Sequence, residues 1–510
     1  MGRERSMTKS RIRTTILALV ASLLIGMVLS ACSKRNDSSP PVGNASEVTL
    51  KFYFGGVKKA ATDEVWAKVS QHLKSKGLNV KFSINFIPIE DFKQKMLEMA
   101  AAGDQWDMNF DADWLSYKQM VSRGSYMSLN DLLPKYAPDL YRKYQEQKTL
   151  SAATMNGQIV GLPWTIKMNE RPFVGWRSDL AEKAGIYREP DSIKTVQDLD
   201  VLLHELKKAY PNEKLSRTPP LSLYLVRDEW VDLQFHGLGF YMNDPGVKIK
   251  AIEQQPFYLE SALMSKKWND DKILNRDATI DTENGADQWR NGKTLFTITS
   301  HEWANANPGF VDPSYRQQMS LIYPDKRYVN RSPLANVLAI NRNSIHADLV
   351  LRFLDMMETD RELYDLVQYG IEGKTYELNG EAAEYPEGMQ FNTSNYMEWE
   401  SQWAFWKPQF MRPTPSYPGD FWVKEAEFAS LPINVSSAVD GLFISDETIK
   451  SEVTARDGLF GEVGKRIEYG KTTNVAQEVA NYVERQKAIG LDKVISAVQK
   501  QVDEYMASRN

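Results

Sequence analysis

The chain has 510 residues, with 62 basic and 67 acidic side chains, a net charge of −5 and one cysteine, Cys32. A lone cysteine excludes disulfides within the chain, and the acidic balance argues against a surface that binds nucleic acid or anionic membranes. The length is too great for one hydrophobic core and predicts two lobes of ordinary domain size.

The first 31 residues have the pattern of a secretory signal peptide. Five basic residues and Glu4 precede residues 14–31, which carry no charge and are mostly apolar. Removing residues 1–31 takes away five basic residues and one acidic residue, so 57 basic and 66 acidic residues remain and the net charge is near −9. A single transmembrane anchor is the alternative, because about 18 apolar residues is near the lower limit for a span.

Cys32 directly follows Leu29-Ser30-Ala31. Leu-Ser-Ala-Cys resembles the lipobox of bacterial lipoproteins, whose cysteine receives a diacylglyceryl group and becomes the first residue after cleavage. Two or more acyl chains, such as palmitate, hold a protein stably at a membrane. Residues 32–47 are mostly small and polar and predict a flexible tether. We therefore expect a lipid-anchored protein on the extracellular face of the cell membrane.

The folded part is predicted to begin with alternating strands and helices. Residues 48–54, 80–87 and 106–110 are apolar runs typical of strands. Helices are predicted from Thr62 and over residues 90–102, because apolar residues recur there at three- and four-residue spacing and a glycine follows each pattern. This alternation predicts an α/β fold with a parallel sheet covered by helices.

Two later passages suggest that the chain crosses between lobes. Residues 156–164 predict a turn and a strand ending in Gly-Leu-Pro-Trp, and residues 173–180 predict another strand, so we expect a crossing near residues 164–167. Residues 291–299 predict a further turn and strand. Residues 336–341 predict a strand that follows the return crossing.

Two helices are predicted in the last third of the chain. The first covers residues 347–359 and aligns Leu349, Phe353 and Met356 on one face. The second covers residues 474–508 and is interrupted at Gly490. Its last part aligns four residues on one face, which are Val494, Val498, Val502 and Tyr505.

In this order the segments resemble the extracellular solute-binding lipoproteins of bacterial carbohydrate ABC importers, in the maltose-binding-like class. The resemblance rests on the lipobox at Cys32 and on short segments spread over the chain: residues 103–107, 161–164, 176–180, 291–293 leading to Trp303, and the helix after Asn341. Residues 369–376 and 490–494 resemble a larger Firmicute-type subgroup.

The resemblance implies a periplasmic-binding-protein-like fold, in which a multi-strand hinge joins two lobes and the ligand cleft lies between them. Lobe 1 would comprise residues 48–166 and 335–385, and lobe 2 would comprise residues 167–334 and 386–510. The implied function is to bind an oligosaccharide by hinge closure and to deliver it to two permease subunits and their ATPase. The protein would act as a monomer without a cofactor.

Sugar rings stack on indoles, and sugar hydroxyls need carboxylate or amide partners near strand ends that face the cleft. Each residue that fits this description could instead belong to the core or to a solvated loop. The candidate ligand-binding residues are Trp303, Trp164, Asp113, Trp114, Glu302, Glu372 and Tyr376.

No catalytic or metal-binding motif is recognised in the sequence. The five histidines are scattered, and His301-Glu302-Trp303 lacks the second histidine of a zinc helix. Both Gly-Lys-Thr triplets lack the earlier glycine of a phosphate-binding loop, since Asp287 and Gln368 stand at that position. An exported glycoside hydrolase with two carboxylates and a peptide-binding lipoprotein of the same fold stay open as alternatives.

Overall fold

The computed structural model of the protein describes most of the chain from residue 46 on: residues 46–155, 157–166, 169–275, 277–280, 285–300, 306, 310–312, 314–330 and 332–509. Cys32, the predicted signal peptide and most of the predicted tether lie outside the described residues. Within these ranges, none of the helices combines the length and the apolar character that crossing a membrane requires.

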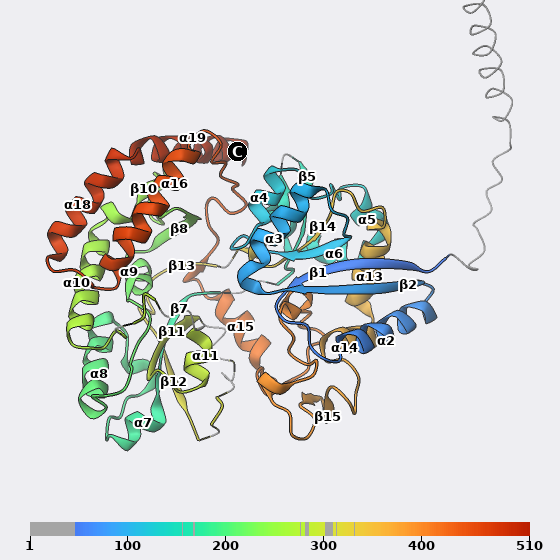
Figure 1. The fold of residues 1–510 in the computed structure, drawn as a ribbon, viewed down its shortest axis with the longest axis horizontal. Coiled ribbons are helices and arrows are strands. Elements are labelled where there is room, and N and C mark those ends of the chain that lie inside the picture. Colours follow the sequence, from blue (N-terminus) through green and yellow to red (C-terminus); the bar gives the residue numbers. More distant parts are fainter. Residues whose placement is uncertain are drawn as a thin grey trace, which may run out of the picture. The chain divides into compact units, whose positions relative to one another are not determined.

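Five strands form the first sheet, in the order β2-β1-β3-β14-β6 (Figure 1). They are β1 (Val48–Gly55), β2 (Val80–Ile87), β3 (Met108–Asp111), β6 (Leu162–Pro163) and β14 (Val337–Ile340). β1 runs parallel to β2 and β3, whereas β14 is antiparallel to both β3 and β6. The predicted parallel sheet is thus confirmed for its first three strands.

Helices pack around this sheet to complete the first lobe. The apolar residues whose spacing predicted the first helix are all buried in α2; they are Val65, Trp66, Val69 and Leu73. Gly103 ends the second predicted helix in the left-handed region, with a φ of 76°. The helices of this lobe are α2 (Thr62–Ser75), α3 (Ile89–Ala102), α4 (Tyr117–Ser122), α5 (Leu132–Tyr136), α6 (Pro138–Gln147), α13 (Ala347–Thr359) and α14 (Arg361–Gln368).

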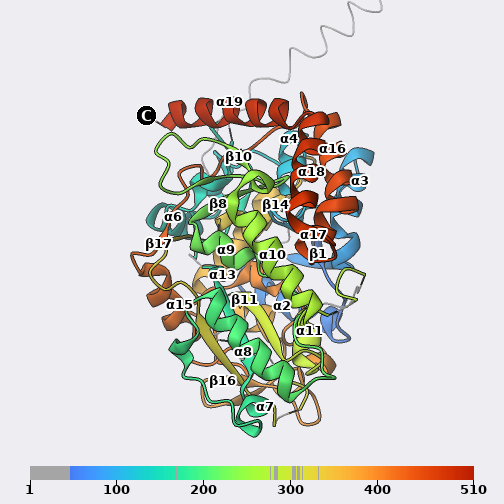
Figure 2. The same ribbon diagram turned by 90° about the vertical axis from the view of Figure 1, so that its left-hand side faces the viewer.

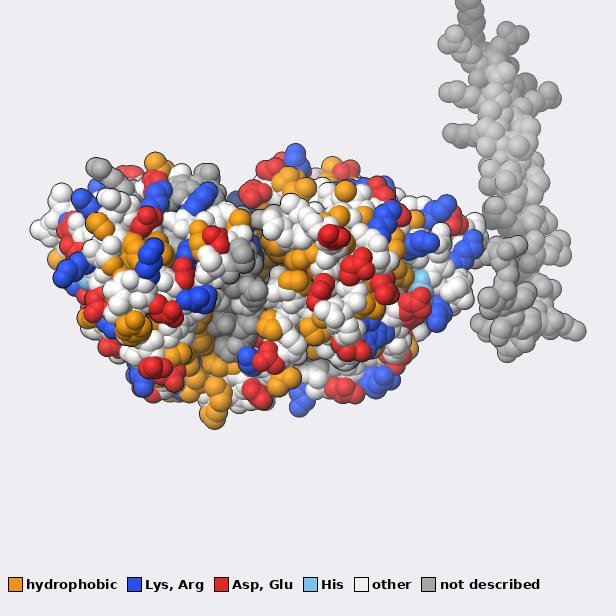
Figure 3. Space-filling model, turned by 90° about the horizontal axis from the view of Figure 1, so that it is seen from below, with side chains coloured by type: hydrophobic (Ala, Val, Ile, Leu, Met, Phe, Trp, Pro, Cys, Tyr) orange, Lys and Arg blue, Asp and Glu red, His pale blue; other side chains and the backbone are white. Residues whose placement is uncertain are grey.

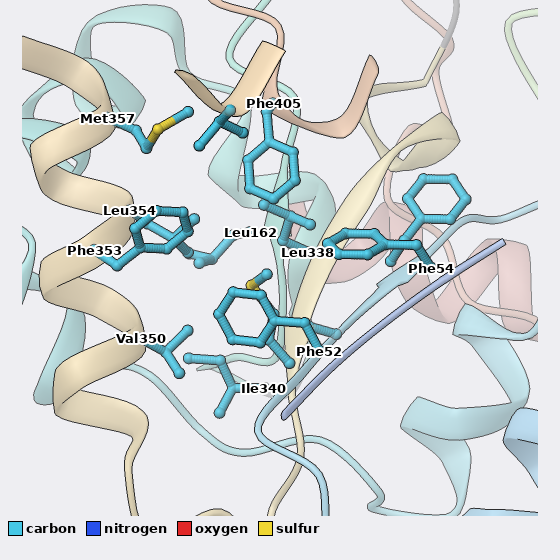
Figure 4. Close-up of a cluster of buried hydrophobic side chains, with 14 of the residues drawn as sticks. Phe52, Phe54, Leu162, Leu338, Ile340, Val350, Phe353, Leu354, Met357 and Phe405 are labelled. Atoms are coloured by element: carbon cyan, nitrogen blue, oxygen red, sulfur yellow. The ribbon is translucent and has the colours of Figure 1, made fainter. Parts of the chain in front are cut away.

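The core of the first lobe is rich in aromatic rings. The ring centroid of Phe52 in β1 lies 6.3 Å from that of Trp66, 5.3 Å from that of Phe82 and 5.9 Å from that of Phe353. Figure 4 shows Phe52 and Ile340 of the sheet together with side chains of α13. The helix predicted over residues 347–359 is confirmed, although its aligned residues differ in burial. Phe353 is buried, whereas Leu349 and Met356 are half-buried.

Residues 396–405 belong to the first lobe. The ring of Trp399 lies 5.2 Å from that of Phe54 and 6.1 Å from that of Phe405, between centroids, and all three rings are buried in the same core. This packing differs from the expected boundary, which assigned residues 386–510 to the second lobe. The aromatic contacts hold the chain on the first lobe for more than 15 residues beyond residue 385.

Two three-stranded antiparallel sheets form the second lobe, in the orders β11-β7-β12 and β10-β9-β8. Their strands are β7 (Pro172–Arg177), β8 (Trp230–Phe235), β9 (Leu238–Tyr241), β10 (Lys250–Ala251), β11 (Phe296–Ser300) and β12 (Gln317–Leu321). The strand predicted over residues 173–180 is shorter than expected, because Ser178 already begins a helix.

The helices of the second lobe come from the middle and the end of the chain. Figure 2 faces this lobe and shows α19 along one end. The helix predicted over residues 474–508 is confirmed as two helices separated at Gly490, whose φ is 100°. The helices are α7 (Ser178–Lys183), α8 (Val196–Ala209), α9 (Leu221–Arg227), α10 (Pro256–Asp270), α11 (Gly285–Arg290), α15 (Phe421–Ser430), α16 (Lys450–Leu459), α17 (Lys465–Glu468), α18 (Val475–Ala488) and α19 (Leu491–Arg509).

Three passages of the chain connect the lobes. The first lies between β6 and β7, the second between β13 (Tyr328–Val329) and β14, and the third precedes α15. β13 pairs in parallel with β17 (Asn434–Val435), which follows α15. The first lobe also contains two short hairpins: β4 (Thr154–Met155) with β5 (Gln158–Ile159), and β15 (Glu377–Asn379) with β16 (Ala382–Glu384).

Trp399→Ala is expected to lower the free energy of unfolding by about 3–5 kcal/mol, because it empties a site bordered by the rings of Phe54, Phe86 and Phe405. Chemical denaturation followed by circular dichroism measures the change. Trp114→Ala is the matched control, since Trp114 is 46% exposed and the loss of its side chain should cost no more than about 1 kcal/mol. Equal losses in the two variants would contradict the core position of Trp399.

Candidate functional site

A cavity of about 600 Å³ lies between the two lobes. The first lobe contributes residues that follow β3, and the second lobe contributes β8. Further lining residues come from 328–330, 332–335 and 437–444, which lie near the connecting passages. The lining mixes aromatic, charged, amide and hydroxyl side chains, among them Asp113, Trp114, Lys118, Glu170, Trp230, Asp232, Gln234, Tyr328, Asn330 and Ser332.

The turn after β3 is organised by Asp111, the last residue of that strand. The buried Asp111 carboxylate accepts hydrogen bonds from the backbone N–H groups of Ala112 at 2.8 Å and Ser116 at 3.0 Å. It also accepts from the hydroxyls of Ser116 and Tyr126. Burial raises the pKa of Asp111 to about 6, although these hydrogen bonds oppose the shift. The turn that carries Asp113 is therefore fixed by a buried network.

Trp114 presents its indole at the cavity. Its N–H donates to the carbonyl oxygen of Ala335 at 2.9 Å, and its ring lies 6.1 Å from that of Phe110 between centroids. The backbone N–H of the preceding Asp113 donates to the carbonyl of Leu334 at 2.9 Å. These contacts hold the edge of the indole while 46% of the residue stays exposed, which leaves ring surface available for stacking.

Lys118 of the first lobe lies in the field of two carboxylates, Asp113 of the same lobe and Asp232 of the second lobe. Burial lowers the pKa of the Lys118 ammonium, and both carboxylates oppose that shift. The surrounding protein raises the pKa of the Asp232 carboxyl even though the residue is exposed to the cavity, and Lys118 opposes this shift. Lys118 and Asp232 therefore place opposite charges on the two lobes that line the cavity, and these charges attract each other.

A bulge in β8 turns polar groups toward the cavity. The pairing of β8 with β9 shifts between Asp232 and Phe235, and Gln234 has a φ of 54°. The backbone N–H of Gln234 donates to the Asp232 carboxylate at 2.7 Å. The irregular strand thus brings a carboxylate and an amide side chain to the same wall.

Trp230 begins β8 and is mainly a packing residue. It is 4% exposed, and its ring lies 5.2 Å from that of Tyr241 and 5.4 Å from that of Phe257. Its indole N–H has no acceptor within the part of the chain that the structure describes. Trp230 therefore closes the end of the cavity mostly through its apolar surface.

Trp164 lies in an aromatic cluster at the connecting passages, which we name the hinge cluster. It is 6% exposed and stacks on Trp406, with centroids 5.8 Å apart and planes 13° apart. Its N–H donates to the carbonyl of Trp403 at 2.8 Å, and Trp422 of α15 packs edge-on against Trp406 at 5.1 Å. The hinge cluster comprises Trp164, Ile166, Trp403, Trp406, Met411, Tyr417 and Trp422. Trp164 is not among the described residues that line the cavity.

Glu372 and Tyr376 lie in a turn that follows α14, on the first lobe. Glu372 is exposed, whereas Tyr376 is 5% exposed and packs against Tyr369 with centroids 5.8 Å apart. The Thr375 hydroxyl closes this turn by accepting from the backbone N–H of Ile371 at 2.7 Å. Neither candidate is among the described lining residues of the cavity. The other two candidates, Glu302 and Trp303, lie outside the described residues.

Of the seven candidates, the structure brings Asp113 and Trp114 to the cavity. Sequence reasoning missed Lys118 and Asp232. Lys118 stands in a short helix, and Asp232 occupies a polar position of an alternating strand, so both have the pattern of ordinary solvent-facing residues. They line the same cavity because the two lobes face each other and because β8 is irregular at Asp232.

Two features of the described residues bear on metal and polyanion binding, namely the clustering of metal-ligating side chains and the charge pattern of one face (Figure 3). The residues that the structure describes contain no group of three or more His, Cys, Asp or Glu side chains that could hold a metal ion. On the face shown in Figure 3, basic and acidic side chains are interspersed over both lobes. This mixed pattern differs from the continuous basic stripe typical of nucleic-acid-binding surfaces.

Two families match parts of the sequence. The family described as bacterial extracellular solute-binding protein matches residues 68–369, which is more than half of the chain, and a domain of unknown function matches residues 441–507. A protein of Streptococcus pneumoniae described as a carbohydrate ABC transporter substrate-binding protein is 22% identical, over 96% of this chain and 98% of its own length.

Solved structures share the fold. NgtS, an N-glycan transport solute-binding protein of S. pneumoniae, matches with a TM-score of 0.74 and 17% identity, over 91% of this chain and 100% of that chain. Its complex with Man5GlcNAc matches with a TM-score of 0.67 and 19% identity, over 91% and 99%. FusA of S. pneumoniae in complex with kestose matches with a TM-score of 0.60 and 15% identity, over 90% and 100%. The predicted two-lobed α/β fold is thereby confirmed.

Asp111 should make stability depend on pH. Its pKa of about 6 in the folded protein lies above the ordinary value, so the folded state binds more protons, and stability falls as pH rises from about 4 to about 6. Asp111→Asn is expected to remove a decline of up to about 3 kcal/mol over this window, while its amide oxygen still accepts from the turn. Denaturant titrations of both proteins at several pH values measure the difference. If the free energy of unfolding depends on pH in the same way in the wild-type protein and in Asp111→Asn, Asp111 has an ordinary pKa.

Proposed function

The chain belongs to the bacterial extracellular solute-binding protein family, and we propose that it is a receptor that captures an oligosaccharide for an ABC importer. The observation that carries this proposal is the cavity between the lobes, where the exposed indole of Trp114 lies among carboxylate, amide and hydroxyl groups. A sugar ring presents a C–H face that stacks on an indole and hydroxyls that need polar partners.

The described relatives support the choice of ligand class. NgtS is described in complex with Man5GlcNAc and FusA in complex with kestose, and both ligands are oligosaccharides. In the proposed site, Trp114 stacks on one sugar ring, and Asp113, Asp232 and Gln234 hydrogen-bond to hydroxyls. Glu302 and Trp303 remain part of the proposal, because in the sequence they stand two and three residues after the end of β11 of the second lobe.

We propose that capture occurs by closure of the lobes about the hinge cluster. Besides the Lys118–Asp232 interaction, Arg290 of α11 bridges the lobes, since its guanidinium lies 4.5 Å from the centroid of the Phe391 ring of the first lobe. These contacts favour the closed arrangement, and a ligand that touches both walls would favour it further. No covalent bond of the ligand would be cleaved, in keeping with the descriptions of the relatives as binding proteins.

The proposed partners are two permease subunits and an ATPase, which are separate chains of the importer. We propose that the receptor acts as a monomer and is held near them by the lipid on Cys32, on the extracellular face of the membrane. The lipobox pattern and the polar tether over residues 32–47 support this anchoring.

The ligand class is tested by thermal unfolding with Man1GlcNAc, Man5GlcNAc and kestose. Binding at a concentration of 100 times Kd should stabilise the protein by about 2.7 kcal/mol and raise its Tm. Trp114→Ala should weaken the binding of the active glycan by about 1–3 kcal/mol, as measured by calorimetric titration.

The matched control is Tyr187→Ala, which removes an aromatic residue that is 73% exposed and not among the described cavity residues. It should leave the affinity unchanged. Unaltered binding by Trp114→Ala would remove Trp114 from the site, and the release of smaller sugars during incubation would favour the glycoside hydrolase alternative.

The anchor is tested by Cys32→Ser in the full-length protein. We expect the wild-type protein to incorporate labelled palmitate and to fractionate with membranes, because acyl chains bury many methylene groups in the bilayer. The Cys32→Ser variant should incorporate no label. If the wild-type protein also incorporates no label and still fractionates with membranes, residues 14–31 act as a transmembrane anchor instead.

A further inference from the structure

One wall of the cavity is a loop at the start of the C-terminal region. Residues 437–444, which we name the cleft loop, follow β17 and contribute several lining residues, including Val439, Asp440 and Leu442. The domain of unknown function matches residues 441–507, so it begins inside this loop and ends in α19. The matched region therefore extends from the cleft loop to α19.

Polar side chains of α19 hold the backbone at two points, one inside the cleft loop and one directly after it. The Tyr505 hydroxyl donates to the carbonyl oxygen of Asp440. The Gln501 side chain accepts from the backbone N–H of Ser445 at 2.7 Å and donates to the carbonyl of the same residue at 3.0 Å. Because three hydrogen bonds join α19 to residues 440 and 445, the path of the cleft loop between them is restrained.

The apolar face of α19 supports the same wall and the neighbouring one. Val498 and Val502 are buried in one cluster with Val439 of the cleft loop and Val231 of β8. β8 also carries Asp232, which lines the cavity. A single helix therefore lies behind two walls that face the proposed ligand.

Gly441 shows how closely the cleft loop is packed between α19 and the first lobe. Its φ is 84°, and a Cβ atom placed there would lie 3.1 Å from the Tyr505 hydroxyl and 3.5 Å from the Cα of Ala152 in the first lobe. The left-handed backbone favours glycine at this position. A small shift of the loop would therefore change its contact with both neighbours.

We propose that α19 positions the cleft loop for ligand binding, with Tyr505 and Gln501 as its positioning residues. The C-terminal region that matches a domain of unknown function would thus form the rear support of the binding cleft. This inference rests on the proposed function for its effect on affinity, whereas the restraint on the loop concerns the ligand-free protein.

The test uses Tyr505→Phe and the double variant Tyr505→Phe/Gln501→Leu in the full chain. Hydrogen exchange of the ligand-free proteins should be faster at residues 438–445, by about tenfold in the double variant, because the restraining hydrogen bonds are gone. Calorimetric titration with Man5GlcNAc should show an affinity weaker by about fivefold to tenfold. Exchange elsewhere in the second lobe should be unchanged.

The matched control is Tyr210→Phe, which removes a similar hydrogen bond from a tyrosine hydroxyl to the carbonyl of Leu180, at 2.8 Å, on the far side of the second lobe. Equal effects of Tyr210→Phe and Tyr505→Phe on affinity, or unchanged exchange at residues 438–445, would overturn the positioning role. If the wild-type protein binds no glycan, the proposed function fails, and the exchange measurement alone still decides whether α19 restrains the loop.

Discussion

A buried carboxylate at the end of the central strand β3 is the constraint on which the binding face depends. Asp111 is fully buried and is surrounded by hydroxyl and backbone N–H donors from a single turn and from Tyr126. An unsatisfied charge in this position would be costly, so the turn has little freedom to rearrange. Because β3 lies in the middle of the sheet, the same network fixes Asp113 and Trp114 relative to the core of the first lobe.

The elements with a strong apolar period could be predicted from the sequence. α2, α3 and α19 lie within a few residues of their expected bounds, because burial on one helix face leaves a regular pattern. Residues 396–405 have no such period. Glu398 and Ser401 adopt positive φ values of 58° and 67°, and the aromatic side chains reach the core through irregular backbone and contacts distant in sequence.

The sequence predicted a cavity residue only where its position after a predicted strand was enough to identify it. Asp113 and Trp114 follow the carboxyl end of a central strand, where the ligands of open α/β sheets bind. The same reasoning selected Trp164, but its stacking partner Trp406 lies 242 residues further along the chain, and no local pattern reveals that contact. Lys118 and Asp232 line the cavity from different lobes, and no local pattern in the sequence shows that the two residues share a site.

The tryptophans of the hinge cluster make the movement of the lobes accessible to spectroscopy. Trp406 is tied to the first lobe, since the backbone N–H of the next residue donates to the Tyr364 hydroxyl at 3.2 Å, whereas Trp422 belongs to α15, which packs against β7 of the second lobe through Phe428. Rotation of one lobe against the other is therefore expected to change the angle between the indoles of Trp406 and Trp422, whose centroids lie 5.1 Å apart. Ultraviolet emission and exciton coupling of these rings would then report lobe movement without any attached dye.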